Sequence, residues 1–326
     1  MDFRMIVDLP PQEFELGLGS RVLTLGSCFA EGMGRRLAES LPDGAVAVNP
    51  MGALYSPASV CSALDMLVEG HFREDEYVFR GRDGMWHSWM HSADFSAATR
   101  EGCVAKVAAR FSEAARLLRA ADVVCLTLGT AHTWWLKNGG EVVGNCHKEL
   151  PATFETGRLT VTETAERMAE TLERLHAMNP HARVVVTVSP YRYAKLGLHG
   201  SMLSKAVLHL ATEELVAKMG FVCYFPAYEI VTDELRDYRF YDCDMAHPSA
   251  QAADYVWERF RAWCFTQELE DYGRDKMVLL KAERHRPLTD DAAMLAALAE
   301  GVTQRRRTFH EKWDGRVAEL GGGAPP

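Results

Sequence analysis

RVLTLGSCFAEG, residues 21–32, changes from an apolar strand pattern to a helical pattern within one short segment. The segment predicts a strand over residues 21–26 and a helix over residues 29–40. A strand that passes through Gly-Ser directly into a helix begins a βα unit, which is typical of α/β folds. Ser27 then stands at the carboxyl end of its strand, the edge of the sheet where such folds bind ligands.

Strand and helix patterns alternate along most of the chain. Buried strands are predicted over residues 45–49, 122–128, 183–188 and 221–225. Helices are predicted over residues 57–69, 97–118, 162–178, 201–219 and 248–263. The strands are apolar throughout rather than alternating, which is typical of a parallel sheet covered by helices on both faces. We therefore expect a three-layer α/β domain over residues 1–265.

The last part of the chain, residues 266–326, has a different character. Between residues 290 and 320 it is charged, with apolar side chains at helical spacing, namely Leu295, Leu298, Val302, Phe309, Trp313 and Val317. One amphipathic face of this kind predicts a helical extension that packs on the core or on a second copy of the chain. A homo-oligomer formed through this helix is one arrangement that the pattern allows.

Composition excludes several classes of protein. The 326 residues are 48% hydrophobic and 25% charged, as in ordinary soluble proteins. The net charge of -9 disfavours nucleic acid binding, and no segment approaches the roughly 20 apolar residues that span a bilayer. Eight cysteines without a CxxC pair, and an N-terminus without a signal-peptide pattern, predict a reduced, cytoplasmic location. No cofactor is expected.

Ser27 has two interpretations. Gly26 permits a tight strand–helix turn that would expose the Ser27 hydroxyl at the edge of the sheet, beside helix N–H groups able to stabilise an oxyanion. The competing interpretation is a helix N-cap, which serines often provide.

A second segment, YDCDMAHPSAQAADYVW, residues 241–257, supplies a partner for a nucleophile. Asp244 and His247 are three residues apart at the start of a helix, with Pro248 suited to its first position. In a loop, the carboxylate can reach Nδ1 of the imidazole and leave Nε2 free to take a proton from a serine. Asp242 is an alternative acid, and a capped helix start with a surface histidine is the competing interpretation.

Ordered segments along residues 20–265 resemble the GSCFA family, which is related to the SGNH (GDSL-like) hydrolases. The segments are GSCFA (26–30), NPMGALYSP (49–57), LTLGTAHTW (126–134), NCHKEL (145–150), NPHARVVVTVSPYRY (179–193), YFPAYEIVTDELRDYRFY (224–241) and DMAHPS (244–249). The resemblance implies a three-layer flavodoxin-like fold. It also implies that Ser27 is the nucleophile and that Asp244 and His247 are its partners.

The resemblance further implies an oxyanion hole. The glycine block of SGNH hydrolases matches Gly52, whose backbone N–H would act together with that of Ser27. The third block, G-x-N, falls on Gly129, Thr130 and Ala131, so its asparagine side chain is absent. The residues that would replace that donor are Thr130, His132, Asn145 or Asn49, and His147 and His91 are suited to holding a polar substrate.

Other chemistry has less support. Cys28 is interpreted as a small buried residue at the helix start rather than as a nucleophile. The histidines and Cys146 show no compact metal-ligand spacing, so no metal site is expected. Four tryptophans, at positions 86, 89, 134 and 135, are interpreted as core side chains or as a platform for a sugar.

These observations together favour a serine-dependent acyl ester hydrolase or acyltransferase, acting on an O-acylated carbohydrate or a similar small molecule. The alternatives are a ligand-binding module that keeps the fold without catalysis, and a scaffold that works through the C-terminal helix. The sequence does not distinguish hydrolysis from transfer, because both use the same three residues.

Overall fold

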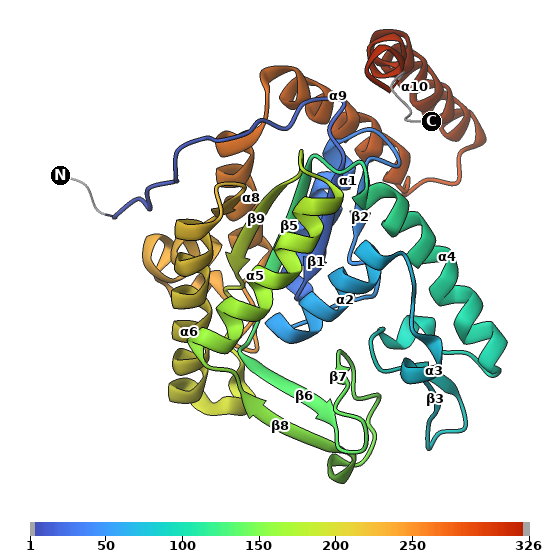
Figure 1. Cartoon of the computed structure of the whole chain (residues 1–326). Coiled ribbons are helices and arrows are strands. Elements are labelled where there is room, and N and C mark those ends of the chain that lie inside the picture. The colour runs from blue at the N-terminus through green and yellow to red at the C-terminus, as the bar shows by residue number, and fades with distance from the viewer. Residues whose placement is uncertain (1–3, 322–326) are drawn as a thin grey trace.

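Five parallel strands form the centre of the protein, in the spatial order β10-β9-β5-β1-β2 (Figure 1). The strands are β1 (Val22–Gly26), β2 (Val46–Val48), β5 (Val123–Leu128), β9 (Arg183–Val188) and β10 (Val222–Tyr224). The computed structural model describes residues 4–321. Numbered along the chain, the order is 2-1-3-4-5 read from the β2 edge, which is the flavodoxin-like order. The predicted three-layer α/β fold is confirmed.

Different helices cover the two faces of this sheet (Figure 1). One face, with Leu23 and Leu25, packs against α2 (Pro57–Glu69), α4 (Arg100–Leu118), α5 (Val161–Met178) and α6 (Gly197–Lys218). The other face, with Val22 and Val185, packs against α1 (Cys28–Ser40), α8 (Ala250–Cys264) and α9 (Gln267–Arg284). Side chains of both faces are buried because helices lie above and below, as the uniformly apolar strands predicted.

Two small antiparallel sheets extend beyond the carboxyl edge of the central sheet (Figure 1). One pairs β3 (Val78–Arg80) with β4 (Trp86–Ser88), and the other has the order β7-β6-β8. The strands of the second are β6 (His132–Leu136), β7 (Val142–Val143) and β8 (Phe154–Arg158). The sequence did not predict these sheets, because their strands are short and mostly half-exposed. Short helices α3 (Glu74–Tyr77) and α7 (Ala227–Glu229) complete the connections.

The C-terminal extension forms helices α9 and α10 (Ala292–Gly321). Trp313 of α10 is 1% exposed and its ring lies 5.3 Å from that of Tyr272 on α9. The second half of α10 therefore packs on α9, which in turn packs on α1. Met294 and Leu298, near the start of α10, are exposed. A homo-oligomer formed through this helix stays a prediction, as does the domain boundary at residue 265.

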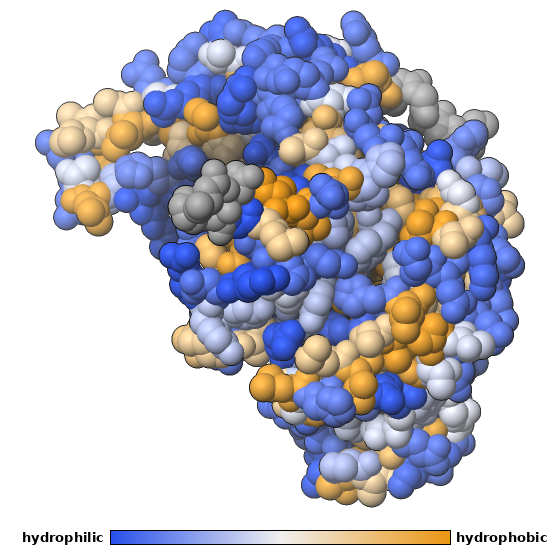
Figure 2. All heavy atoms as spheres, turned by 90° about the vertical axis from the view of Figure 1, so that its left-hand side faces the viewer, coloured by the Kyte–Doolittle hydropathy of each residue, from blue (hydrophilic) through white to orange (hydrophobic). Residues whose placement is uncertain are grey.

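The surface is mixed rather than uniformly apolar. Figure 2 shows the side of the molecule that carries α6, where hydrophilic residues surround smaller apolar groups. The exposed apolar side chains of α6 include Leu198, Met202 and Leu210. Within residues 4–321, none of the helices combines the length and the apolar character needed to cross a bilayer.

Gly26 sets the geometry of the turn from β1 to α1. Its φ angle is +143°, and a Cβ atom at this position would collide with the carbonyl oxygen of Thr127 on the neighbouring strand β5. The N–H of the next residue, Ser27, donates to that same oxygen at 3.2 Å. Strand β1 can therefore end this close to β5 only with glycine at residue 26.

We expect Gly26→Ala to lower the free energy of unfolding by at least ~2 kcal/mol, because the new methyl group meets backbone atoms that cannot move aside. Chemical denaturation monitored by circular dichroism measures this loss. Gly44→Ala is the matched control: Gly44 also has a positive φ angle, +80°, but nothing lies within 4 Å of its Cβ position. That variant should lose only about 1–2 kcal/mol. Equal losses in the two variants would contradict the steric argument.

Candidate active site

The loop before α8 holds Asp244 and His247 in direct contact. Nδ1 of His247 lies 2.5 Å from Oδ2 of Asp244, so the imidazole N–H donates to the carboxylate. The other carboxylate oxygen, Oδ1, accepts the backbone N–H groups of Ala246 and His247, each at 2.9 Å. The predicted Asp–His contact is therefore present, and it leaves Nε2 of His247 available as a base.

The pKa of Asp244 is lowered to about 2. The largest cause is the backbone N–H of His247, followed by the His247 side chain and the N–H of Ala246. The Asp244 carboxylate therefore stays ionised throughout the neutral and mildly acidic range. Helix α8 begins at Ala250 with Ser249 as its N-cap, so Pro248 precedes the helix and does not occupy its first position.

A pocket of about 270 Å³ opens between this loop and the start of α1. Its lining comprises Cys28, Phe29, Gly32, Met33, Arg36, Tyr191, Asp242, His247, Pro248 and Ala253. The ring of Tyr191 lies over the imidazole of His247, with the two centroids 4.2 Å apart. The pocket therefore lies between the imidazole of His247, which Asp244 holds in place, and the N-terminus of α1 at the carboxyl edge of the sheet.

Ser27, the nucleophile that the sequence predicts, is enclosed in the structure. Ser27 is 0% exposed, does not line the pocket, and its Oγ has no hydrogen-bond partner within residues 4–321. Helix α1 begins at Cys28, one residue earlier than predicted, so Ser27 is the N-cap residue, although its hydroxyl makes no capping bond. At this position the hydroxyl is enclosed in the protein, and the role of Ser27 as nucleophile stays a prediction.

Cys28, rather than Ser27, shares the pocket with His247. Its side chain is partly exposed, in contrast to the buried position that the sequence predicted. Burial raises the pKa of the Cys28 thiol, while the N–H groups of Phe29 and Cys28 act in the opposite direction. A protonated thiol of this kind needs a base, and the pocket provides one in His247.

The predicted oxyanion hole is also not formed as expected. The N–H of Ser27 donates to Thr127, and the N–H of Gly52 donates to the carbonyl oxygen of Asn49 at 2.7 Å. Gly52 has a φ angle of +83° and completes a tight turn there. At the start of α1, the N–H groups of Cys28 and Phe29 precede the first intrahelical bond, which runs from Glu31 to Ser27. These two N–H groups therefore have no partner within the helix, and N–H groups of this kind are able to bind an anion.

Asn49, one candidate for the missing donor, lies at the carboxyl end of β2 and is buried. Its Nδ2 donates to the carbonyl oxygens of Gly26 and Ser27 at 3.2 and 3.3 Å. The side chain therefore fixes the β1–α1 turn from the side opposite Thr127. Its Oδ1 has no partner within residues 4–321, but an acceptor of this kind cannot stabilise an oxyanion.

Gly129 and Thr130, which belong to the third block, form hydrogen bonds with side chains of α6. Oγ1 of Thr130 hydrogen-bonds with Oγ of Ser204 at 3.0 Å, and the carbonyl oxygen of Gly129 accepts from Nζ of Lys205 at 2.6 Å. The N–H groups of Gly129 and Thr130 both donate to the carbonyl oxygen of Tyr55. The backbone N–H groups of both residues are therefore engaged within the protein, and the role of Thr130 as a replacement donor stays a prediction.

The remaining predicted residues lie outside the pocket lining. His132 lies on β6 opposite Arg158 of β8. Oδ1 of Asn145 accepts the N–H of His147. His147 donates through Nε2 to the carbonyl oxygen of Ser88 at 2.8 Å. His91 is 1% exposed, and burial lowers its pKa to about 3. These four residues hold the loops around the small sheets, so the structure does not bring them to His247.

A model of the GSCFA family matches residues 21–260. The chain belongs to the GSCFA family. None of the curated proteins compared with the chain matches it.

Two solved structures have partial similarity to this GSCFA protein. A protein provisionally described as a platelet activating factor, from Streptococcus pneumonia, has 12% identity and a TM-score of 0.38, over 74% of this chain and 83% of that one. An acetyl xylan esterase from the rumen bacterium Butyrivibrio proteoclasticus has 11% identity and a TM-score of 0.38, over 75% of this chain and 65% of that one. These values are too low to transfer an activity or a substrate.

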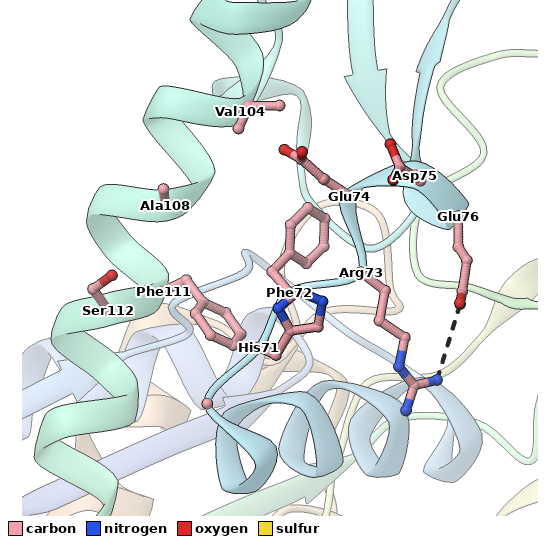
Figure 3. Close-up of a pocket in the computed structure, with 11 residues that line it drawn as sticks. His71, Phe72, Arg73, Glu74, Asp75, Glu76, Val104, Ala108, Phe111 and Ser112 are labelled. Atoms are coloured by element: carbon pink, nitrogen blue, oxygen red, sulfur yellow. Dashed lines mark ion pairs between the residues drawn. The ribbon is translucent and has the colours of Figure 1, made fainter.

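Another cavity of the GSCFA protein, of about 450 Å³, lies between α4 and the segment that joins α2 to α3 (Figure 3). Its lining is rich in acidic side chains, and Arg73 forms an ion pair with Glu76 (Figure 3). Arg73 also pairs with Glu69 of α2. Among the residues that line this cavity, no nucleophilic side chain is hydrogen-bonded to a base. Within residues 4–321, no group of three His, Cys, Asp or Glu side chains is arranged to hold a metal ion.

We expect the Asp244 carboxyl of the GSCFA protein to titrate near pH 2 when followed by carbon NMR of labelled aspartate. Because this pKa is lowered, the ionised carboxylate stabilises the folded loop at pH values above the usual pKa of an aspartate. This contribution to stability is lost as the pH falls toward 2. In His247→Ala the midpoint should rise but stay below that of a free aspartate, because both backbone N–H donors remain. A midpoint at the usual value in the wild type would show that the loop is not formed.

Proposed function

We propose that this GSCFA protein is an acyl-transfer enzyme that cleaves O-acyl esters with Cys28 as the nucleophile. The observation that carries the proposal is the pocket shared by Cys28 and His247, with His247 held by Asp244. A nucleophile, a base and an acid that orients the base are the parts of a catalytic triad. Here the nucleophile is a thiol.

In the first half of the reaction, Nε2 of His247 takes the proton of the Cys28 thiol. The thiolate attacks the ester carbonyl, and the N–H groups of Cys28 and Phe29 stabilise the oxyanion that forms. When this intermediate collapses, the C–O bond of the ester breaks and His247 returns the proton to the departing alkoxide. The products of this half are an alcohol and a thioester on Cys28.

In the second half, water or another hydroxyl group attacks the thioester. His247 removes the proton of the attacking oxygen, and the C–S bond breaks to release either a carboxylic acid or a new ester. The released thiolate takes the proton back from His247, which restores the starting state. Asp244 stays ionised throughout and stabilises the imidazolium that forms twice in the cycle.

The lining of the pocket supports an acyl ester of a polyol, such as an O-acylated carbohydrate. Phe29, Met33 and Pro248 provide an apolar surface for the acyl group. Tyr191, whose ring lies over that of His247, adds an aromatic face and a phenolic hydroxyl to the pocket. Apolar walls with a few polar groups are typical of small-molecule sites.

A ligand-binding module that keeps the fold without catalysis is the second candidate. One observation favours it. The N–H groups of Ser27 and Gly52, the two donors of the predicted oxyanion hole, already donate to backbone carbonyl oxygens. The same pocket would then bind an ester without cleaving it. Turnover of any acyl ester that depends on Cys28 separates the two candidates.

We expect Cys28→Ala and His247→Ala each to lower kcat/KM at least about 10³-fold, because the triad acts as a unit. The assay is release of p-nitrophenol from short acyl esters, together with release of acid from a panel of acylated sugars. Mass spectrometry of the enzyme quenched during turnover should find the acyl group on Cys28, as a thioester that neutral hydroxylamine removes.

Ser27→Ala is the matched control, since it alters the neighbouring residue. We expect its kcat/KM to stay within about threefold of wild type and its stability to be equal or slightly higher, because an enclosed hydroxyl without a partner is lost. Loss of turnover in Ser27→Ala with retention in Cys28→Ala would reverse the assignment. An absence of turnover in all folded forms across the panel would favour the binding module.

A further inference from the structure

A small inner cavity lies behind the candidate active-site pocket. Its volume is about 30 Å³, and it is enclosed between α1, α8 and the face of the sheet that α1 covers, with Val185 of β9 and Phe260 of α8 in its lining. Most of its lining side chains are apolar and buried. Phe29 and Met33 line this inner cavity and also line the pocket of about 270 Å³ that contains Cys28. These two side chains therefore separate the pocket from the inner cavity.

The spacing of residues on α1 places this boundary next to Cys28. Gly32 follows Cys28 by four residues, so the two lie on one side of the helix. Gly32 has no side chain, and a Cβ atom there would meet only the Arg36 guanidinium, at 3.6 Å. The surface of α1 beside Cys28 is therefore open to a group bound to its sulfur. Met33 is the next residue, and together with Phe29, one turn before it, Met33 bounds this open surface on the side of the sheet.

The two side chains of the boundary differ in how firmly they are packed. Phe29 is 8% exposed and belongs to the buried cluster between α1 and the sheet, whereas Met33 is partly buried and packs against that cluster. A methionine side chain is unbranched and adapts its shape to its neighbours. Met33 is therefore the part of the boundary that a substitution can open with the least damage to the core.

We propose that Met33, together with Phe29, sets the length of the acyl group that the site accepts, and that this site takes short acyl groups such as acetyl. The inference rests on the proposed function, in which Cys28 carries the acyl group as a thioester. A short acyl group fits over Gly32 in front of Met33. A longer chain has to displace the Met33 side chain, because the inner cavity behind it is closed and too small to hold a chain by itself.

Two substitutions separate the length of the boundary side chain from the packing under α1. Met33→Ala shortens a side chain that both cavities share, and so joins the inner cavity to the pocket. Leu37→Ala is the matched control, because Leu37 lies one turn further along α1 and lines the inner cavity but not the pocket. Leu37 is 1% exposed. Its truncation enlarges the same inner cavity and lowers stability, but it leaves Met33 and Phe29 in place.

The experiment is the rate at which alkyl methanethiosulfonates, with alkyl groups from methyl to octyl, modify Cys28 in the folded full chain. Each reagent transfers its alkylthio group to the sulfur of the thiolate and releases methanesulfinate. Mass spectrometry without reduction reads the Cys28 peptide, and the exposed Cys243 reports the intrinsic reactivity of each reagent. In Met33→Ala we expect the octyl-to-methyl ratio of rates at Cys28 to rise at least about tenfold. Leu37→Ala should stay within about twofold of wild type.

An unchanged ratio in folded Met33→Ala would overturn the proposal, and so would an equal rise in Leu37→Ala, which would assign the effect to looser packing under α1. The kcat/KM values for p-nitrophenyl acetate and octanoate should change in the same direction as the modification rates if the proposed function holds. The modification itself needs no turnover. A protein that cleaves no ester but whose modification ratio still depends on Met33 would therefore contradict the proposed function and leave the length limit in place.

Gly32→Val keeps the proposal testable if Met33→Ala does not fold. Gly32 lies inside α1, where valine is more favourable than glycine, and only the Arg36 side chain lies near its Cβ position. The branched side chain should obstruct the surface between Cys28 and Met33. We expect the butyl and octyl rates at Cys28 to fall at least about tenfold more than the methyl rate. An equal decrease for all three reagents would show that groups on Cys28 do not extend along α1.

Discussion

The geometry of the site depends on the close approach of β1 to β5 at Gly26. Because no Cβ fits between Gly26 and the carbonyl oxygen of Thr127, the chain can turn there with Ser27 still bound to β5 through its N–H. The hydroxyl of Ser27 is then directed into the protein. The next side chain, that of Cys28, occupies the first position of α1 and lines the pocket. One backbone contact thus determines which of the two adjacent side chains lines the pocket.

The sequence predicted the layers of the fold well because strong local signals agree with one another. Helix α2 is found at the predicted residues, since Ser56 provides a capping box, Pro57 occupies the first turn and Gly70 ends the helix in the left-handed region. The small sheet of β6, β7 and β8 was missed. Its strands pair mainly with one another, and β7 has only two residues, so neither alternation nor length distinguished them from loops.

Local sequence encodes some features of the candidate site and not others. The contact between Asp244 and His247 follows from three-residue spacing in a loop, which local sequence can encode. The choice between Ser27 and Cys28 depends on a one-residue difference in where α1 begins, and helix ends are the least certain feature of a sequence pattern. The buried contacts of Lys205 with the carbonyl oxygens of Gly129 and Ser189 were not foreseen either, because only the packing of α6 on the loops after β5 and β9 reveals them.

Several weak contributions act on one sulfur atom at this site. Burial raises the pKa of the Cys28 thiol, the N–H groups of Phe29 and Cys28 act in the opposite direction, and His247 lines the same pocket. The central claim is that Cys28, and not Ser27, faces His247. A crystal structure of the protein after reaction with a small haloacetamide tests it most directly. The account predicts a modified Cys28 Sγ inside the pocket beside the imidazole, with the Ser27 hydroxyl still enclosed. An unmodified Cys28 directed into the protein, with the Ser27 hydroxyl beside His247, would contradict it.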